Sequence, residues 1–385
     1  MSESDYDVVI VGGGVIGLSV ARELKRDGVE RVVVLEREGA VGQRSSSRAN
    51  GGVRAQFSTS INIAFSLYSI EEFERLASAQ GDILQFHQTG YLFVTGSERG
   101  EALLRGFLEL QHSVGCDAEW LTPPQVLERA PIVRPAGLRG GTWHARDGFL
   151  DPHGVVEVMK REARNLGAEL RLNSEVRALD RTPGGFVVTT DRYDLRARFV
   201  VNAAGADARH IGGMLDVDVP VRPIRRNLAF ARAPDHPAEL IPMCVDFDTG
   251  VLVRREVGGG YLIAYSNPAD EPGWETTVDP RFLDDVAERI GNRFPLVSEV
   301  PIDPRHCWAG LYPETEDHHA IVGGGKVDGF VQCVGFGGHG IMHSPAAGRA
   351  VAELIARGEC RSFDLHPLRL ERFAQGDLTV ESAVL

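Results

Sequence analysis

The chain has 385 residues, with 41 Lys or Arg against 54 Asp or Glu, and therefore a formal net charge of −13. This acidic balance excludes non-specific nucleic-acid binding, which needs a basic surface, and gives no attraction to an anionic membrane. The length predicts about two domains at ~150 residues each. The 44 glycines indicate backbone that packs closely against other groups.

The N-terminal segment and the cysteines predict a cytoplasmic protein. Residues 1–7 are acidic, and the apolar stretch after them is broken by three glycines, so it predicts a core strand rather than a signal peptide. No run approaches the ~18 apolar residues of a membrane span. The cysteines are odd in number, widely spread and never in a Cys-x-x-Cys pattern, which is typical of reduced thiols. They are Cys116, Cys244, Cys307, Cys333 and Cys360.

The first forty residues have the order of a dinucleotide-binding unit. A β-branched run at 8–11 predicts a buried strand, and helical spacing of apolar residues follows until Gly28. A second apolar run at 32–35 ends at an acidic residue, Glu36. Strand, glycine turn, helix, strand and terminal acid within this length predict a bound dinucleotide.

The turn between this strand and helix is a G-x-G-x-x-G motif in which each glycine has its own role. Gly12 permits the tight turn, Gly14 lets the backbone approach a pyrophosphate, and Gly17 lets the helix pack on the strand. The N-terminus of the helix presents unpaired N–H groups to the phosphates. Glu36 accepts hydrogen bonds from a ribose and repels a 2′-phosphate, which disfavours NADP and leaves NAD and FAD open.

Residues 37–54 form a polar stretch of small residues with no apolar period, which predicts a loop or a helix entry. With the motif before it, this stretch resembles the D-amino-acid oxidase superfamily of FAD-dependent enzymes, in the branch of sarcosine oxidase, glycine oxidase and the proline dehydrogenase β-subunit. In that family the segment lies along the flavin, so the resemblance implies FAD as the cofactor. The implied contacts in the N-terminal part are Gly12, Gly14, Val15, Gly17, Glu36, Arg37, Ser46, Ser47, Arg48, Asn50 and Gly51.

The middle of the chain predicts a helix from about residue 153 and then strands at 170–176, 186–190 and 197–201. This order resembles the second half of the same flavoprotein domain. There the residue that matches Val176 meets the adenine through its backbone, and Ala204 and Gly205 lie near the pyrophosphate. Alternating runs within 83–95 and 219–264 instead predict an antiparallel sheet with one face open to solvent or to a ligand.

These patterns predict an α/β fold, α+β overall. It consists of a Rossmann-like FAD-binding domain of the glutathione-reductase type and an inserted antiparallel-sheet substrate domain. The predicted FAD-binding domain is discontinuous and covers 1–82, 145–218 and 300–385. The predicted substrate-binding domain covers 83–144 and 219–299.

The C-terminal part resembles the return strand of that family over 308–323, and a strand is predicted at 330–334. A glycine turn follows, and a helix is predicted from Ser344 and Pro345 to Gly358. In the family this turn lies at the flavin ring and the helix points its N-terminus at the pyrimidine. His339 and His343 have no evident third partner, so no metal site is predicted. The implied flavin contacts here are Gly310, Gly337, Gly338, His339, Gly340 and Ile341.

The resemblance implies removal of a hydride from the C–N bond of a small secondary or N-methyl amino acid, such as sarcosine or proline, to give an imine. Arg54 matches the family's substrate arginine and is expected to clamp the carboxylate. Tyr261 and Tyr265 are expected to face the ring from a strand, and His339 completes the predicted catalytic set.

Three departures from the family limit what can be carried over. Gly310 stands where monomeric sarcosine oxidases attach the flavin through a cysteine, so FAD is expected to bind non-covalently. Met342 replaces a carboxylate-binding lysine, and no lysine lies near 267–270, where the family's oxygen-activating lysine falls. The electron acceptor, O₂ or another molecule, therefore stays open. Two alternatives also stay open: a 2-hydroxy-acid dehydrogenase of the same superfamily, and an FAD subunit active only in a hetero-oligomer. A homo-oligomer is equally compatible with the sequence.

Overall fold

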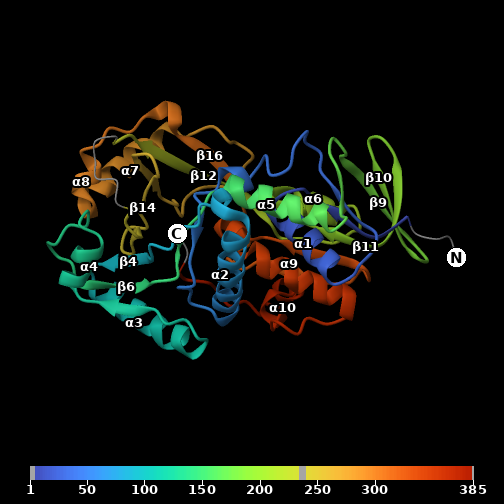
Figure 1. The fold of residues 1–385 in the computed structure, drawn as a ribbon, viewed down its shortest axis with the longest axis horizontal. Helices are drawn as coiled ribbons and strands as arrows, with labels where there is room; N and C mark the ends of the chain where they lie inside the picture. The colour runs from blue at the N-terminus through green and yellow to red at the C-terminus, as the bar shows by residue number, and fades with distance from the viewer. Residues whose placement is uncertain (1–4, 234–239, 384–385) are drawn as a thin grey trace.

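The computed structural model describes residues 5–233 and 240–383 and contains two large sheets. Figure 1 shows the first sheet and its helices in one half of the molecule and the second sheet in the other. The predicted combination of a Rossmann-like domain and a second sheet domain is confirmed. No helix in the described ranges combines the length and the apolar character that a membrane crossing needs. None of the five cysteines, all of which are described, forms a disulfide.

The first sheet is built around β1, which lies between two parallel neighbours, β11 and β2. Its path runs β17-β18-β11-β1-β2-β8, and the β9–β10 hairpin extends it beside β11. β1 is buried on both faces, as the sequence predicts: Val8 and Ile10 pack in one core, Val9 and Val11 in another. The strands are β1 (Tyr6–Val11), β2 (Val32–Leu35), β8 (Glu169–Arg171), β9 (Val176–Thr182), β10 (Gly185–Thr190), β11 (Asp194–Asn202), β17 (Ile321–Gly323) and β18 (Phe330–Val334).

Four helices form the layer on one face of this sheet. Helix α1 packs against α9 and α5, and α2 packs against α9 (Figure 1). The bounds are α1 (Val15–Arg26), α2 (Ser60–Gln80), α5 (Pro152–Asn165) and α9 (Gly340–Arg357), with the short α6 (Ala208–Gly213) and α10 (Arg372–Gln375) elsewhere on the domain.

The second sheet has the order β16-β12-β15-β14-β13-β4-β6-β5. It is antiparallel as predicted, except that β13 and β4 run parallel. β16 lies within the range predicted for the FAD-binding domain but pairs with β12 of this sheet. The strands are β4 (Tyr91–Thr95), β5 (Glu119–Leu121), β6 (Gly140–His144), β12 (Arg222–Ala231), β13 (Met243–Asp246), β14 (Leu252–Arg255), β15 (Tyr261–Ala264) and β16 (Trp308–Glu314). The remaining elements are α3 (Glu98–Ser113), α4 (Pro123–Arg129), α7 (Pro280–Arg293), α8 (Pro295–Ser298) and the small β3–β7 pair (Gly52–Val53, Gly148–Phe149).

Helix α9 begins four residues before the start that the sequence predicts, at Gly340 rather than at Ser344. Pro345 therefore lies inside the helix and removes one N–H from its hydrogen-bond ladder. The carbonyl of Ile341, which that N–H would have reached, accepts a hydrogen bond from the Ser344 hydroxyl at 2.9 Å. The glycine turn and the helix N-terminus are in consequence one continuous structure.

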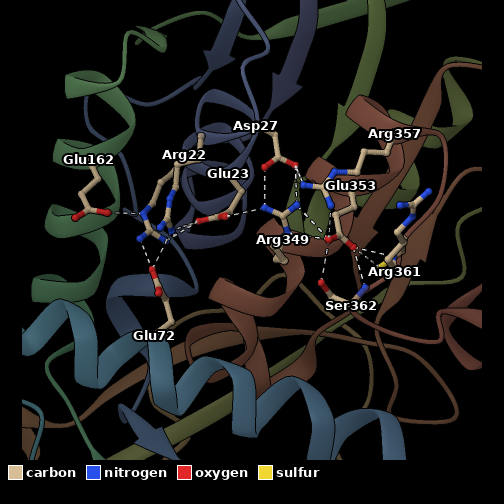
Figure 2. A network of polar contacts seen from close by, with 12 residues as sticks. Arg22, Glu23, Asp27, Glu72, Glu162, Arg349, Glu353, Arg357, Arg361 and Ser362 are labelled. Atoms are coloured by element: carbon tan, nitrogen blue, oxygen red, sulfur yellow. Dashed lines mark hydrogen bonds and ion pairs between the residues drawn. The ribbon is translucent and has the colours of Figure 1, made fainter.

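A network of charged side chains ties α1 to the helices around it (Figure 2). The Arg22 guanidinium is fully buried and contacts Glu23 of its own helix, Glu72 of α2 and Glu162 of α5. Burial alone would raise the pKa of Glu72, but hydrogen bonds and charge from Arg75 and Arg22 lower it to about 2. Three carboxylates on three helices are thus held by one buried cation.

We expect Arg22→Met to lower the free energy of unfolding by about 3–5 kcal/mol, because it leaves buried carboxylates without their cation. Urea denaturation followed by far-UV circular dichroism measures this loss. Arg305→Met is the matched control, because the Arg305 side chain pairs with Asp303 in solvent. Loss of this exposed ion pair should lower the free energy of unfolding by at most about 1 kcal/mol. Equal losses for the two variants would show that the Figure 2 network does not stabilise the helix layer.

Candidate functional site

A cavity of about 660 Å³ opens where the carboxyl ends of β1, β2, β11 and β18 meet. This edge of a parallel sheet is where nucleotide cofactors bind in folds of this class. Most of the residues predicted to contact FAD line this cavity. They are Gly12, Gly14, Val15, Glu36, Arg37, Ser46, Arg48, Val176, Ala204, Gly205, Gly337, Gly338, Gly340 and Ile341.

The three glycines of the first turn occupy three different environments. Gly12 has φ of +112°, and a Cβ there would stand 2.5 Å from the Ala203 carbonyl oxygen. A Cβ on Gly17 would stand 2.0 Å from the Gly12 carbonyl oxygen, so this glycine lets α1 pack on β1. A Cβ on Gly14 would meet only the Ser46 hydroxyl, at 3.4 Å, and would otherwise project into the cavity. The turn therefore leaves a cradle that fits a pyrophosphate.

Glu36 lies beside this cradle with its carboxylate fixed by backbone groups. One oxygen accepts a hydrogen bond from the Gly13 N–H at 2.8 Å, and the other accepts from the Glu38 N–H at 2.9 Å. Arg37 and Asp207 form an ion pair at 2.6 Å, and both line the cavity. A carboxylate at the end of β2 is the group that dinucleotide sites use for a ribose hydroxyl. The donors and the shape present thus fit FAD.

The polar loop that follows Glu36 is held against β16. The Trp308 indole N–H donates to the Arg48 carbonyl oxygen at 3.0 Å, and the Arg48 guanidinium donates to the Ala309 carbonyl oxygen at 2.7 Å. A Cβ on Gly310 would approach Cβ of Arg48 to 3.0 Å, so Gly310 makes room for this loop and does not line the cavity.

Six predicted cofactor residues lie outside the first cavity. Gly17 and Gly310 serve packing as described above, and a Cβ on Gly51 would meet the Leu150 carbonyl oxygen at 2.1 Å. Ser47 lines a third, more open cavity behind the loop. Asn50 and His339 line the second cavity, described next.

A second cavity of about 540 Å³ lies between the two sheets. It shares Tyr312, Gly335, Gly337 and Gly338 with the first cavity. A molecule in the second cavity would therefore meet a cofactor in the first at this glycine turn. Its lining includes three of the four predicted catalytic residues, namely Arg54, Tyr265 and His339.

Arg54 brings a positive charge into the second cavity. Its side chain is 1% exposed, and its guanidinium donates to the carbonyl oxygens of Gln56 and Ala383 and stacks 3.8 Å from the Phe57 ring centroid. Burial lowers the pKa of Arg54, which nevertheless stays charged at neutral pH. No carboxylate in the ranges 5–233 and 240–383 forms an ion pair with it, so its charge is available to an anionic ligand.

His339 is a neutral imidazole beside this cation. Burial, and then the charge of Arg54, lower the pKa of His339 well below 6.5. Its ring contacts Phe57 edge-on at 4.9 Å between centroids and lies 5.7 Å from the ring of His343. The part of the chain that the structure describes contains no group of three or more His, Cys, Asp or Glu side chains suited to a metal ion.

Of the two predicted tyrosines, at and just beyond β15, only one lines the second cavity. Tyr265, just beyond the end of the strand, lines the second cavity. Tyr261 does not: it is 4% exposed and packs in the core on the other face of the sheet, with its ring 5.0 Å from the Arg255 guanidinium. The prediction for Tyr261 is therefore corrected. Strand alternation alone would place residues 261 and 265 on the same face, and Tyr265 lines the cavity because β15 ends at Ala264, before it.

Two tyrosines that the sequence did not identify line the second cavity as well. Tyr312 of β16 also lines the first cavity, and Gly338 leaves room for its ring, which a Cβ there would approach to 2.6 Å. Tyr91 of β4 lies 6.0 Å from the Arg54 guanidinium. Tyr312 stands inside the return-strand motif, which was the one signal that could have identified it.

Comparisons with known proteins agree with this geometry. The family model described as "FAD dependent oxidoreductase" (DAO) matches residues 7–354. The FAD-dependent oxidoreductase domain-containing protein 1 of Bos taurus is 30% identical, and the match covers 98% of this chain and 87% of that protein. Glycine oxidase of Geobacillus kaustophilus is 28% identical, with 95% of this chain and 97% of that protein covered.

Among solved structures, L-proline dehydrogenase from P. horikoshii superposes with a TM-score of 0.91 at 26% identity, covering 98% of this chain and 100% of that chain. The family model spans the glycine turn, the second sheet and most of α9, and therefore both cavities. FAD is thus the cofactor of this chain, and the donors and shape of the first cavity fit it. The chain belongs to the DAO family of FAD-dependent oxidoreductases.

Proposed function

We propose that this chain oxidises the C–N bond of a small secondary or N-methyl amino acid, such as sarcosine or proline, to an imine. The observation that carries the proposal is the buried Arg54 guanidinium, which has no ion-pair partner among the described residues and lines the cavity that meets the cofactor cavity. A guanidinium binds a carboxylate through two parallel hydrogen bonds, which also fixes the orientation of the bound acid.

The chain's own residues would orient the substrate beside the cofactor cavity. Arg54 would hold the carboxylate, and Tyr91, Tyr265 and Met342 would enclose the rest of the molecule. The substrate would react as the free amine, after release of its ammonium proton to solvent, and the neutral His339 can accept a hydrogen bond from the amine N–H. The C–H bond then breaks with departure of a hydride, the lone pair forms the C=N bond, and water hydrolyses the imine. FAD, when bound, supplies the hydride acceptor.

The relatives support a small amino acid as substrate. Their names include glycine oxidase and L-proline dehydrogenase. Human dimethylglycine dehydrogenase is also 26% identical, although this chain covers only 45% of its length. All three names refer to small amino acids that carry a carboxylate close to the nitrogen, which is the arrangement that Arg54 would select.

We propose that FAD binds non-covalently. Cys333 is the cysteine that lines the first cavity, and burial raises its pKa, so that it stays a protonated thiol and a weak nucleophile. The disulfide-free cysteines support the cytoplasm as the location.

Anaerobic mixing of the holoenzyme with a substrate panel tests the proposal. Sarcosine or proline should bleach the flavin absorbance, whereas dimethylamine and pyrrolidine, which lack the carboxylate, should bleach it at least about tenfold more slowly. Bleaching by lactate or another 2-hydroxy acid alone would instead support the hydroxy-acid dehydrogenase. No bleaching by any member would contradict a chain active by itself and favour the hetero-oligomeric subunit. Admission of O₂ to the bleached enzyme then shows whether O₂ is the acceptor.

A further inference from the structure

The C-terminal segment 377–383 returns to the substrate cavity, although no motif in it indicates a site. The carbonyl oxygen of Ala383 accepts a hydrogen bond from the Arg54 guanidinium across 329 residues of sequence. The second acceptor of that guanidinium, the Gln56 carbonyl oxygen, lies only two residues away in the chain. Of the two hydrogen bonds from the Arg54 guanidinium to backbone carbonyl oxygens, the C-terminal segment thus provides the one that is distant in sequence.

Glu381 anchors this segment to the start of α2. Its side chain has 0% exposure, and its carboxylate accepts hydrogen bonds from the Ser58 N–H at 2.8 Å, the Thr59 hydroxyl at 2.7 Å and the Asn62 amide at 3.0 Å. The Ser58 hydroxyl donates to it as well. Burial alone would raise the pKa of Glu381, but the hydrogen bonds from Ser58 and Thr59 outweigh burial and lower it. The anchor is therefore a charged carboxylate at neutral pH.

The backbone of the segment is fixed on both sides of this anchor. The Ser382 N–H donates to the Ser58 hydroxyl at 2.9 Å, and the Glu381 N–H donates to the Asp317 carbonyl oxygen at 3.1 Å. Asp317 in turn forms a fully buried ion pair with Arg372 at 2.7 Å. These contacts leave the Ala383 carbonyl oxygen little freedom relative to α2.

The contact with Arg54 orients its charge without neutralising it. A guanidinium has five N–H donors, and the described residues Gln56 and Ala383 engage one on each terminal nitrogen. Both acceptors are carbonyl oxygens, so the positive charge stays uncompensated by contact. Glu381 acts on that charge only over a longer range, where its field favours the charged form.

We propose that the C-terminal segment 377–383 is a positioning element for the carboxylate clamp, with Glu381 as its positioning residue. This inference rests on the proposed function of Arg54. Free arginine side chains lose up to about 2 kcal/mol of rotamer entropy when they are immobilised. A guanidinium already held by Ala383 and Gln56 has met that cost before the ligand arrives, and its affinity for a carboxylate rises accordingly.

Binding of acetate to the holoenzyme, followed by perturbation of the flavin spectrum, tests the segment, with acetamide as the uncharged probe. Glu381→Ala should weaken acetate binding by about tenfold and leave acetamide binding within about twofold. Glu381→Gln, which keeps the side-chain shape, should also weaken acetate binding. It provides the test if the alanine variant does not fold. Glu359→Gln is the matched control, because Glu359 lies outside the segment, is exposed and pairs with Arg361 at the surface, and it should change neither probe.

The outcomes separate this inference from the proposed function. If the wild type binds acetate no better than acetamide, Arg54 is not a carboxylate clamp. That result would overturn both the proposed function and the positioning role of the C-terminal segment. If the wild type prefers acetate and the Glu381 variants bind it equally well, only the positioning role is overturned. Equal weakening of both probes would mean a general loss of cavity structure and would also overturn it. In an Arg54→Ala background, Glu381→Ala should have no further effect on acetate, because the two changes remove the same interaction.

Discussion

Arg54→Ala should raise the KM for the carboxylate substrate by about 100- to 1000-fold while FAD stays bound. The side chain can give a substrate carboxylate two charge-assisted hydrogen bonds in a buried cavity, together worth about 3–4 kcal/mol. At 1.4 kcal/mol for each factor of ten, this loss gives the stated range. FAD should remain because Arg54 lines the second cavity and not the first.

Steady-state kinetics with the best substrate of the panel, together with the FAD content of each variant, measures this effect. Arg54→Lys should fall between the wild type and the alanine variant, because an ammonium keeps the charge but not the paired donors. Arg222→Ala is the matched control: Arg222 also lines the second cavity, but its side chain is exposed, and we expect less than about a threefold change. An unchanged KM for Arg54→Ala would contradict the clamp and, with it, the proposed substrate class.

The first half of the cofactor site could be predicted because its determinants are local. The strand, the glycine turn, the helix and Glu36 lie within about thirty residues, and each residue type follows from a short-range requirement of backbone or charge. The structure places Gly12, Gly14 and Glu36 around one cavity, as that pattern requires. Arg54, by contrast, was predicted only from the resemblance to the family, and the structure places it at the second cavity.

The rest of the substrate site depends on contacts that no local pattern encodes. Tyr261 and Tyr265 are four residues apart and would share one face of a continuous strand, so what separates them is that β15 ends at Ala264. The Glu381 anchor joins residues more than 300 positions apart, from a segment without periodicity. Its buried carboxylate could be recognised only once Ser58, Thr59 and Asn62 had been brought around it.

The start of α9 shows the same limit at short range. Pro345 predicts a helix N-terminus nearby, because proline fits the first turn best. The structure instead begins the helix at Gly340, and Ser344 supplies the donor that the proline removes. The helix N-terminus therefore lies at the glycine turn where the two cavities meet, four residues before the start that Pro345 predicts.

Gly14→Val should abolish most FAD binding in a chain that still folds, raising the Kd for FAD by about 100-fold. The backbone at Gly14 has φ of −74° and ψ of 177°, a conformation open to valine, and the nearest atom to a new Cβ is the Ser46 hydroxyl at 3.4 Å. The added methyl groups therefore project into the cavity and do not clash with protein atoms. Overpacking costs about 1–3 kcal/mol. The upper end of that range, applied to bound FAD, corresponds to the expected rise in Kd of about 100-fold.

Titration of the FAD-free chain with FAD, alongside urea denaturation of the same FAD-free chain, separates binding from folding. Gly17→Ala is the informative contrast, because its Cβ would stand 2.0 Å from a backbone oxygen and should destabilise the fold itself. Gly213→Ala has no atom within 4 Å of its Cβ and should change neither measurement. If Gly14→Val binds FAD like the wild type, the cradle does not hold the pyrophosphate. If it unfolds like Gly17→Ala, the space beside Gly14 belongs to the packing of the protein and not to the cofactor.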